Sequence, residues 1–85
     1  RLGMSESELK QKIEAATFRK IIKHLQDNRS LQNIDLMNLA GFCRNCISKW
    51  YVESSKEQGD EIDYEKAKEI VYSMPYAEWK EKYQK

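Results

Sequence analysis

Apolar and weakly polar positions repeat at spacings of three and four residues along the first part of the chain. They are Leu9, Ile13, Ala16, Thr17, Ile21, His24 and Leu25. This spacing is typical of an amphipathic helix that packs on a core. Ser5 and Glu8 have the S-x-x-E spacing of a capping box, in which each side chain bonds a backbone N–H near the helix start. We therefore expect a helix from residue 6 to about residue 26.

The segment from residue 33 to residue 52 is the most apolar part of the chain. Its seam, at spacings of 4, 3, 4, 3 and 4, consists of Leu36, Ala40, Cys43, Ile47, Trp50 and Ser54. Neighbouring side chains widen the seam to most of the helix circumference, namely Met37, Leu39, Phe42, Cys46 and Tyr51. This pattern predicts one continuous second helix that ends at Glu57 or Gln58, before Gly59. Because turn-forming residues occupy positions 27–30, the first two helices should form an antiparallel hairpin.

Two shorter helices are predicted in the C-terminal part. Asp63 is a good helix cap, and an apolar face follows until Pro75, formed by Ala67, Ile70, Val71 and Met74. Tyr76, Trp79 and Tyr83 line the last helix, and no segment has the alternation of a strand. The predicted fold is all-α, a small four-helix protein built on a helical hairpin. We expect one domain over residues 4–85, with Arg1 to Gly3 as a remnant of cloning.

Charge and composition exclude several functional classes. Fifteen Lys and Arg side chains against fourteen Asp and Glu give a formal charge of +1. No overall field therefore attracts nucleic acid or an anionic membrane. No apolar run approaches the roughly 20 residues of a membrane span, and the first ten residues lack the apolar region of a signal peptide. We expect a cytoplasmic protein.

The small size of the chain points to self-association. A chain of 10.1 kDa buries roughly 64% of its unfolded surface as a monomer, which is a thin margin. A second helix that is apolar on most sides needs more neighbours than three narrow helices provide. The predicted partner is therefore a second copy of the chain. Candidate interface residues are Ile47, Trp50, Tyr76 and Trp79.

Two segments support a family resemblance. NIDLMNLAGFCRNCISKWY, over residues 33–51, and MPYAEWK, over residues 74–80, resemble the core of a family of short bacterial proteins of unknown function. Members of that family carry similar GFCRNC and MPY-x-EWK segments. The resemblance implies a small helical fold and implies no activity, so the residues must be weighed individually.

The two cysteines form a C-x-x-C pair, Cys43 and Cys46. In thioredoxin-like proteins such a pair lies at a helix N-terminus, which lowers the thiol pKa. In the predicted second helix the pair lies about ten residues from the helix start, where that effect is absent. Side chains at i and i+3 there are also too far apart for an unstrained disulfide. Core packing is the leading interpretation, with metal ligation and redox chemistry as alternatives.

A metal site is a weaker hypothesis. Zinc takes three or four protein ligands, and the chain offers His24, Cys43 and Cys46 as candidates. In a hairpin that turns near Ser30, His24 would lie about 9 Å along the axis from Cys43, which disfavours a site within one chain. A two-fold dimer that joins four thiolates stays open. We expect no cofactor, with zinc or iron as the alternative.

Polar residues in the second helix form a candidate site that consists of Asp35, Arg44 and Asn45. His24 is expected in the last turn of the first helix, where it would face Asp35 and form a structural hydrogen bond. Arg44 and Asn45 interrupt an apolar helix, so they need partners if they are buried. An acidic residue of the third helix or of a second chain is the expected partner. A register-fixing polar network and a ligand-binding role are both open.

The sequence therefore favours a small helical protein that acts as a non-enzymatic homodimer or interaction module, without nucleic-acid or membrane partners. The alternative is a metal-binding or thiol-based enzyme that uses Cys43 and Cys46. Substrate and partner identity do not follow from the residues.

Overall fold

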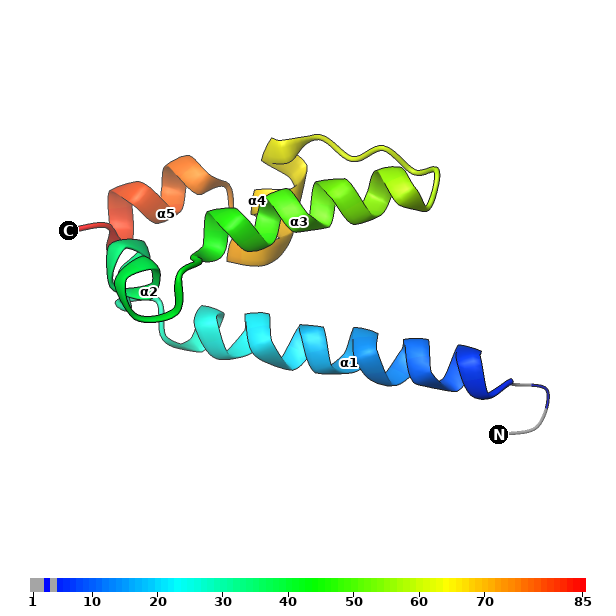
Figure 1. Ribbon diagram of the computed structural model, residues 1–85. Helices are drawn as coiled ribbons and strands as arrows, with labels where there is room; N and C mark the ends of the chain where they lie inside the picture. Colours follow the sequence, from blue (N-terminus) through cyan, green and yellow to red (C-terminus); the bar gives the residue numbers. More distant parts are fainter. Residues whose placement is uncertain (1–2, 4) are drawn as a thin grey trace.

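A computed structural model describes residue 3 and residues 5–85, so the expected remnant at residues 1–3 and the domain start at Met4 fall largely outside the described residues. The described residues contain five helices and no strand (Figure 1). The helices are α1 (Glu6–Asp27), α2 (Asn33–Ala40), α3 (Arg44–Glu57), α4 (Tyr64–Tyr72) and α5 (Tyr76–Tyr83). The all-α prediction is confirmed, and the number of helices is five rather than four.

The first helix has the predicted start and nearly the predicted end. The Ser5 side chain accepts a hydrogen bond from the Glu8 backbone N–H at 3.1 Å, as a helix cap does. Only one face of α1 packs on the rest of the chain, through Phe18, Ile22 and Leu25. Only part of the predicted apolar stripe is therefore buried, and the rest is exposed at the surface.

The prediction of one continuous second helix is wrong, because residues 41–43 are not helical and separate α2 from α3. Gly41 has a left-handed φ of 80°, and its N–H bonds the Met37 carbonyl at 3.0 Å, which closes α2 with an αL cap. Cys43 is extended and forms the N-cap of α3. Glycine reaches positive φ at little cost, so one residue ends the helix although the apolar seam continues beyond it.

Helix α3, rather than α2, runs antiparallel to α1, although α1 packs mainly on α4. Figure 1 shows α3 running back along α1, with the short α2 at the end where the chain turns. The rings of Phe18 on α1 and Tyr51 on α3 lie 6.1 Å apart between centroids. This arrangement places the starts of α2 and α3 beside the end of α1.

Capping residues position the C-terminal helices as predicted. Gly59 has a φ of 78°, and the N–H groups of Gly59 and Asp60 bond the carbonyls of Lys56 and Ser55 at 3.0 and 2.9 Å. This pair of bonds is a Schellman motif. The Asp63 side chain accepts from the Lys66 N–H at 2.8 Å and starts α4, and Pro75 precedes α5.

One core joins four of the helices. Its buried members are Ile22 and Leu25 of α1, Ile47 of α3, Val71 and Tyr72 of α4, and Trp79 of α5. Helix α4 lies against α3, α1 and α5. Helix α2 adds only the partly buried Leu36 and leaves Leu39 88% exposed. The core therefore holds α3, α4 and α5 around the turn where α1 ends.

Candidate functional site

Arg44, the first residue of α3, is buried with only 2% of its surface exposed. Its Nη1 donates to the Leu31 carbonyl at 2.6 Å and to Asn33 Oδ1 at 3.0 Å. Its Nη2 donates to the Asn28 carbonyl at 3.1 Å. The guanidinium carbon also lies 5.1 Å from the ring centroid of Trp79. Among the described residues Arg44 bonds no carboxylate, so the expected acidic partner is replaced by carbonyls at the end of α1.

A chain of hydrogen bonds leads away from Arg44. Asn33 Nδ2 donates to the Tyr72 hydroxyl at 3.0 Å, and that hydroxyl donates to Asn45 Oδ1 at 2.6 Å. Because a guanidinium only donates, Asn33 must present its oxygen to Arg44 and its amide nitrogen to Tyr72. Tyr72 then donates onward to Asn45. We call this series, Arg44 to Asn33 to Tyr72 to Asn45, the hydrogen-bond chain.

Burial affects the ionisable members of the hydrogen-bond chain in opposite directions. Burial raises the pKa of the Tyr72 hydroxyl far above its usual value, so Tyr72 is a neutral donor at physiological pH. Burial also lowers the pKa of the Arg44 guanidinium, with the neighbouring Tyr72 acting in the opposite direction. Arginine stays protonated in proteins, so Arg44 carries a buried positive charge.

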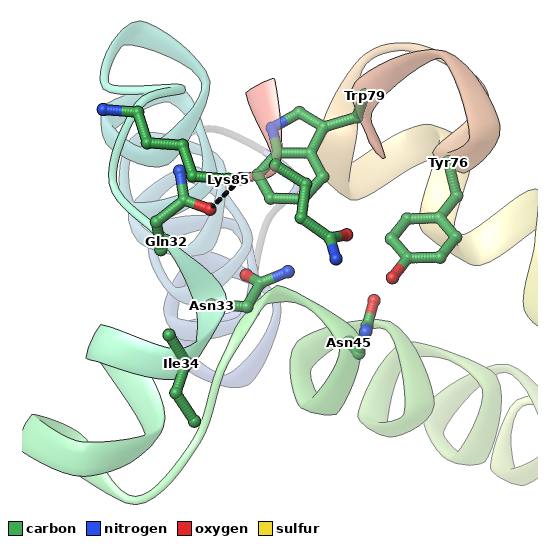
Figure 2. Close-up of a pocket in the computed structure, with 8 residues that line it drawn as sticks. Gln32, Asn33, Ile34, Asn45, Tyr76, Trp79 and Lys85 are labelled. Carbon is green, nitrogen blue, oxygen red and sulfur yellow. Dashed lines mark hydrogen bonds between the residues drawn. The ribbon is translucent and has the colours of Figure 1, made fainter. Parts of the chain in front are cut away.

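A pocket of about 260 Å³ lies beside the end of the hydrogen-bond chain (Figure 2). Its lining residues come from the starts of α2 and α3, from α5 and from the residues after α5: Gln32, Asn33, Ile34, Asn45, Tyr76, Trp79, Gln84 and Lys85. Figure 2 shows the Tyr76 hydroxyl close to the carboxamide of Asn45. None of these residues carries a side-chain carboxylate. We call this the polar pocket.

The indole of Trp79 forms a wall of the polar pocket. Trp79 is 1% exposed, and its Nε1 is the buried side-chain polar atom that has no hydrogen-bond partner in the part of the chain that the structure describes. A buried donor without an acceptor is destabilising by about 1–3 kcal/mol. Such an atom in a native protein requires an explanation.

The cysteines lie at a helix N-terminus, whereas the sequence predicted that they lie in the middle of a helix. Cys43 is the buried N-cap of α3, and the half-buried Cys46 lies in its first turn, with Sγ 3.9 Å from the Met37 Sδ. The premise that both thiols lie deep inside a helix is therefore wrong, because the helix starts again after Gly41. Both thiols are free.

The structure does not bring the remaining sequence candidates together. His24 lies in the last turn of α1 as predicted, but it is exposed, and no hydrogen bond among the described residues joins it to the exposed Asp35. Residue 3 and residues 5–85 include no group of three or more His, Cys, Asp or Glu side chains with the geometry of a metal site. Asp35 therefore lies apart from Arg44 and Asn45, which adjoin the polar pocket.

The candidate interface residues also separate. Ile47 and Trp79 lie in the core of the single chain, Tyr76 is half-buried beside the polar pocket, and Trp50 is 50% exposed. Sequence reasoning missed Asn33 and Tyr72, which complete the hydrogen-bond chain. The available signal was Asn33 next to Gln32, because a side-chain amide that becomes buried needs hydrogen-bond partners.

The two thiols are expected to react at different rates. Cys46 should be alkylated in the folded protein, whereas Cys43 should react only after denaturation, because it is buried. Timed alkylation with peptide mass spectrometry measures both rates. A Cys46→Ser variant should keep one slow thiol, and a fast thiol in that variant would contradict the expected protection of Cys43.

No helix among the described residues has the length and apolar character needed to cross a membrane.

The family of the chain follows from its similarity to other proteins. No curated protein matches the chain. The family described as "Protein of unknown function (DUF1244)" matches residues 31–85, a segment that contains the hydrogen-bond chain and the polar pocket. Because this match covers well over half of its length, the chain belongs to the family Protein of unknown function (DUF1244).

Proposed function

We propose that the protein is a homodimeric interaction module and that α1 provides its self-association surface. The observation that carries this proposal is the apolar face that α1 leaves exposed. Ile13 and Ile21 are 57% and 52% exposed, although they belong to the same helical pattern as the buried Leu25. Isolated exposed apolar residues are common, but two on one face of a helix, beside a groove, favour a docking surface.

The shape of this face suits a second copy of α1. A shallow groove of about 330 Å³ is lined by Thr17, Lys20, Ile21, His24 and Leu25. Positions 17, 20, 21 and 24 have the i, i+3, i+4, i+7 spacing of a hole in knobs-into-holes packing. Ile13 is an exposed apolar knob two turns from Ile21. If two α1 helices cross antiparallel at Thr17, Ile13 of each copy enters the hole of the other.

The charges beside the groove fit the same arrangement. An antiparallel crossing centred on Thr17 pairs positions whose numbers are equally far from 17, so Glu14 faces Lys20 of the partner copy. The two-fold axis repeats this pair. Neither side chain takes part in an ion pair within the described chain. Opposite charges in this register favour the antiparallel dimer over a parallel one.

The test of this proposal is the mass of the protein in solution. Sedimentation equilibrium at low micromolar concentration should give about twice the chain mass of 10.1 kDa. Ile21→Glu should convert the dimer to monomer, since it places a charge in the apolar hole. Leu39→Glu is the matched control, because Leu39 is equally apolar, exposed and located on α2. A wild-type monomer under these conditions would refute the proposal.

A charge exchange tests the antiparallel register. Glu14→Lys and Lys20→Glu should each weaken the dimer by about tenfold, because each change creates two like-charge contacts per dimer. The double variant restores two opposite pairs and should recover the wild-type dissociation constant. A double variant weaker than both single variants would exclude this register.

Thiol chemistry is a second candidate function, supported by the position of the C-x-x-C pair at the start of α3. Helix N-termini favour thiolates. The burial of Cys43 makes this candidate the weaker one, since a catalytic thiol must reach its substrate. A reversible disulfide between Cys43 and Cys46 under a glutathione buffer would favour it over the interaction module.

A further inference from the structure

The polar pocket lies outside the proposed dimer face, since none of its lining residues belongs to α1. Most of its polar lining groups have their partners within the chain. Gln32 donates to the Ser30 and Tyr83 carbonyls and accepts from the Lys85 N–H. Asn33 uses its oxygen on Arg44 and its nitrogen on Tyr72. A ligand can therefore bind only to the lining groups that have no hydrogen-bond partner within the chain.

The lining groups left without a partner include several donors. Asn45 Oδ1 accepts from the Tyr72 hydroxyl at 2.6 Å, and no bond among the described residues engages its Nδ2. Trp79 Nε1 also lacks an acceptor, but it is fully buried, so it is not one of the donors that a ligand in the pocket can reach. The Tyr76 hydroxyl is a second donor in the lining, and Figure 2 shows it close to the Asn45 carboxamide. Gln84 adds a side-chain amide that can donate or accept, so a ligand with hydrogen-bond acceptors fits these groups.

The hydrogen-bond chain also makes the pocket more favourable for a negatively charged ligand than for a positively charged one. It starts at a buried guanidinium that no carboxylate neutralises, and each member donates toward the next, from Arg44 to Asn45. Aligned hydrogen bonds polarise one another in a low-dielectric interior. The Asn45 amide is therefore a stronger donor than an isolated carboxamide. The high pKa of Tyr72 keeps its proton in place, which preserves this direction. A negatively charged acceptor gains most from such an end group.

The remaining walls are apolar. Ile34 and the rings of Tyr76 and Trp79 border the pocket. The two rings are close to parallel, with an angle of 12° between their planes and 6.4 Å between centroids. A volume of about 260 Å³ suits a ligand of about ten non-hydrogen atoms rather than a nucleotide. A fully hydrated inorganic anion would leave the apolar walls unused.

We infer that the polar pocket binds a small organic carboxylate, whose oxygens accept hydrogen bonds from Asn45 and Tyr76 and whose apolar body contacts Ile34 and the aromatic walls. This site is independent of the proposed dimerisation. In this site Arg44 has a second effect besides holding the turn. Its charge polarises the three hydrogen bonds that lead to Asn45, which binds the ligand.

A titration of the whole chain with benzoate tests the inference. In ¹⁵N-labelled protein, millimolar benzoate should shift the side-chain amide signal of Asn45 and the indole signal of Trp79. Benzamide has the same shape without the charge, and it should bind at least about tenfold more weakly. Inorganic phosphate should also bind more weakly, because it lacks an apolar body. Equal binding of benzamide or phosphate, or no binding of benzoate, would overturn the inference.

One substitution tests the role of Asn45. In Asn45→Asp the carboxylate can still accept the Tyr72 hydrogen, but it presents negative charge in place of the amide donor. Benzoate affinity should fall by more than about tenfold, since a donor is replaced by a like charge. Asn38→Asp is the matched control, because Asn38 is an exposed residue of α2 outside the pocket lining. Unchanged affinity in Asn45→Asp, with the wild-type circular dichroism spectrum, would also overturn the inference.

Discussion

Replacing Trp79 with alanine is expected to lower the free energy of unfolding by about 3–5 kcal/mol. The indole is 1% exposed and lies at the centre of the C-terminal packing. Its ring centroid is 5.2 Å from that of Tyr72 and 6.4 Å from that of Tyr83. It also lies below the Arg44 guanidinium at 5.1 Å. Truncation therefore removes core packing, aromatic contacts and a cation–π contact together.

Trp50→Ala is the matched control for this prediction. Trp50 is the other tryptophan of the chain, is 50% exposed and contacts the Phe42 ring at 5.4 Å. Its loss should be destabilising by no more than about 1 kcal/mol. Urea unfolding followed by circular dichroism measures both variants. Equal losses in the two variants would mean that α5 is a peripheral helix rather than part of the core.

The helix ends that depend on local chemistry were predictable from the sequence. Ser5 and Asp63 bond backbone N–H groups three residues ahead, and Gly59 adopts the positive φ of a Schellman end. Pro75 separates α4 from α5. Each of these signals involves residues within one or two turns, so no knowledge of the tertiary fold is needed.

The break at Gly41 was not predictable by the same reasoning. The apolar seam has the same spacing on both sides of the glycine, so periodicity favours one helix. A glycine inside a helix is only moderately unfavourable and does not identify a break by itself. The break becomes favourable because it brings the start of α3 to the end of α1, where Arg44 donates to the carbonyls of Leu25, Asn28 and Leu31. That compensation depends on the tertiary fold.

The site was predictable only in part, for a related reason. Arg44 and Asn45 stood out as polar residues in an apolar segment that need partners if buried. Their partners are backbone carbonyls and the side chains of Asn33 and Tyr72. Carbonyl groups occur at every residue, so the sequence does not indicate which of them face a guanidinium. The charged partner that sequence patterns favour is absent among the described contacts.

The two apolar faces of α1 were not predictable from the sequence for another reason. The pattern from Leu9 to Leu25 predicts one buried face, whereas the structure buries Ile22 and Leu25, partly buries Phe18, and exposes Ile13 and Ile21. A 22-residue helix extends over a core formed mainly by shorter helices, so one of its faces stays free. Helical periodicity identifies apolar faces without stating what covers them.

Arg44→Met is expected to lower the free energy of unfolding by about 3–5 kcal/mol. Methionine has a similar length and fills the space, so the loss measures the hydrogen bonds rather than a cavity. Without the guanidinium, the Leu31 carbonyl and the Asn33 oxygen lose their donor, whereas the Asn28 carbonyl keeps the Leu31 N–H. Each buried acceptor left without a donor is destabilising by about 1–3 kcal/mol, reduced where water can enter. Arg19→Met on the exposed side of α1 should change the free energy by less than about 0.5 kcal/mol.

Arg44→Lys separates the charge from the geometry of the donor group. A lysine keeps the positive charge, but a single ammonium cannot match the forked guanidinium that bonds four acceptors on two nitrogens. We therefore expect Arg44→Lys to lose more than half of the free energy that Arg44→Met loses, in the same urea unfolding experiment. Full stability in Arg44→Lys would show that charge alone holds the turn between α1 and α2. Loss of less than about 1 kcal/mol in Arg44→Met would show that water replaces the guanidinium, and the hydrogen-bond chain would then lack its organising charge.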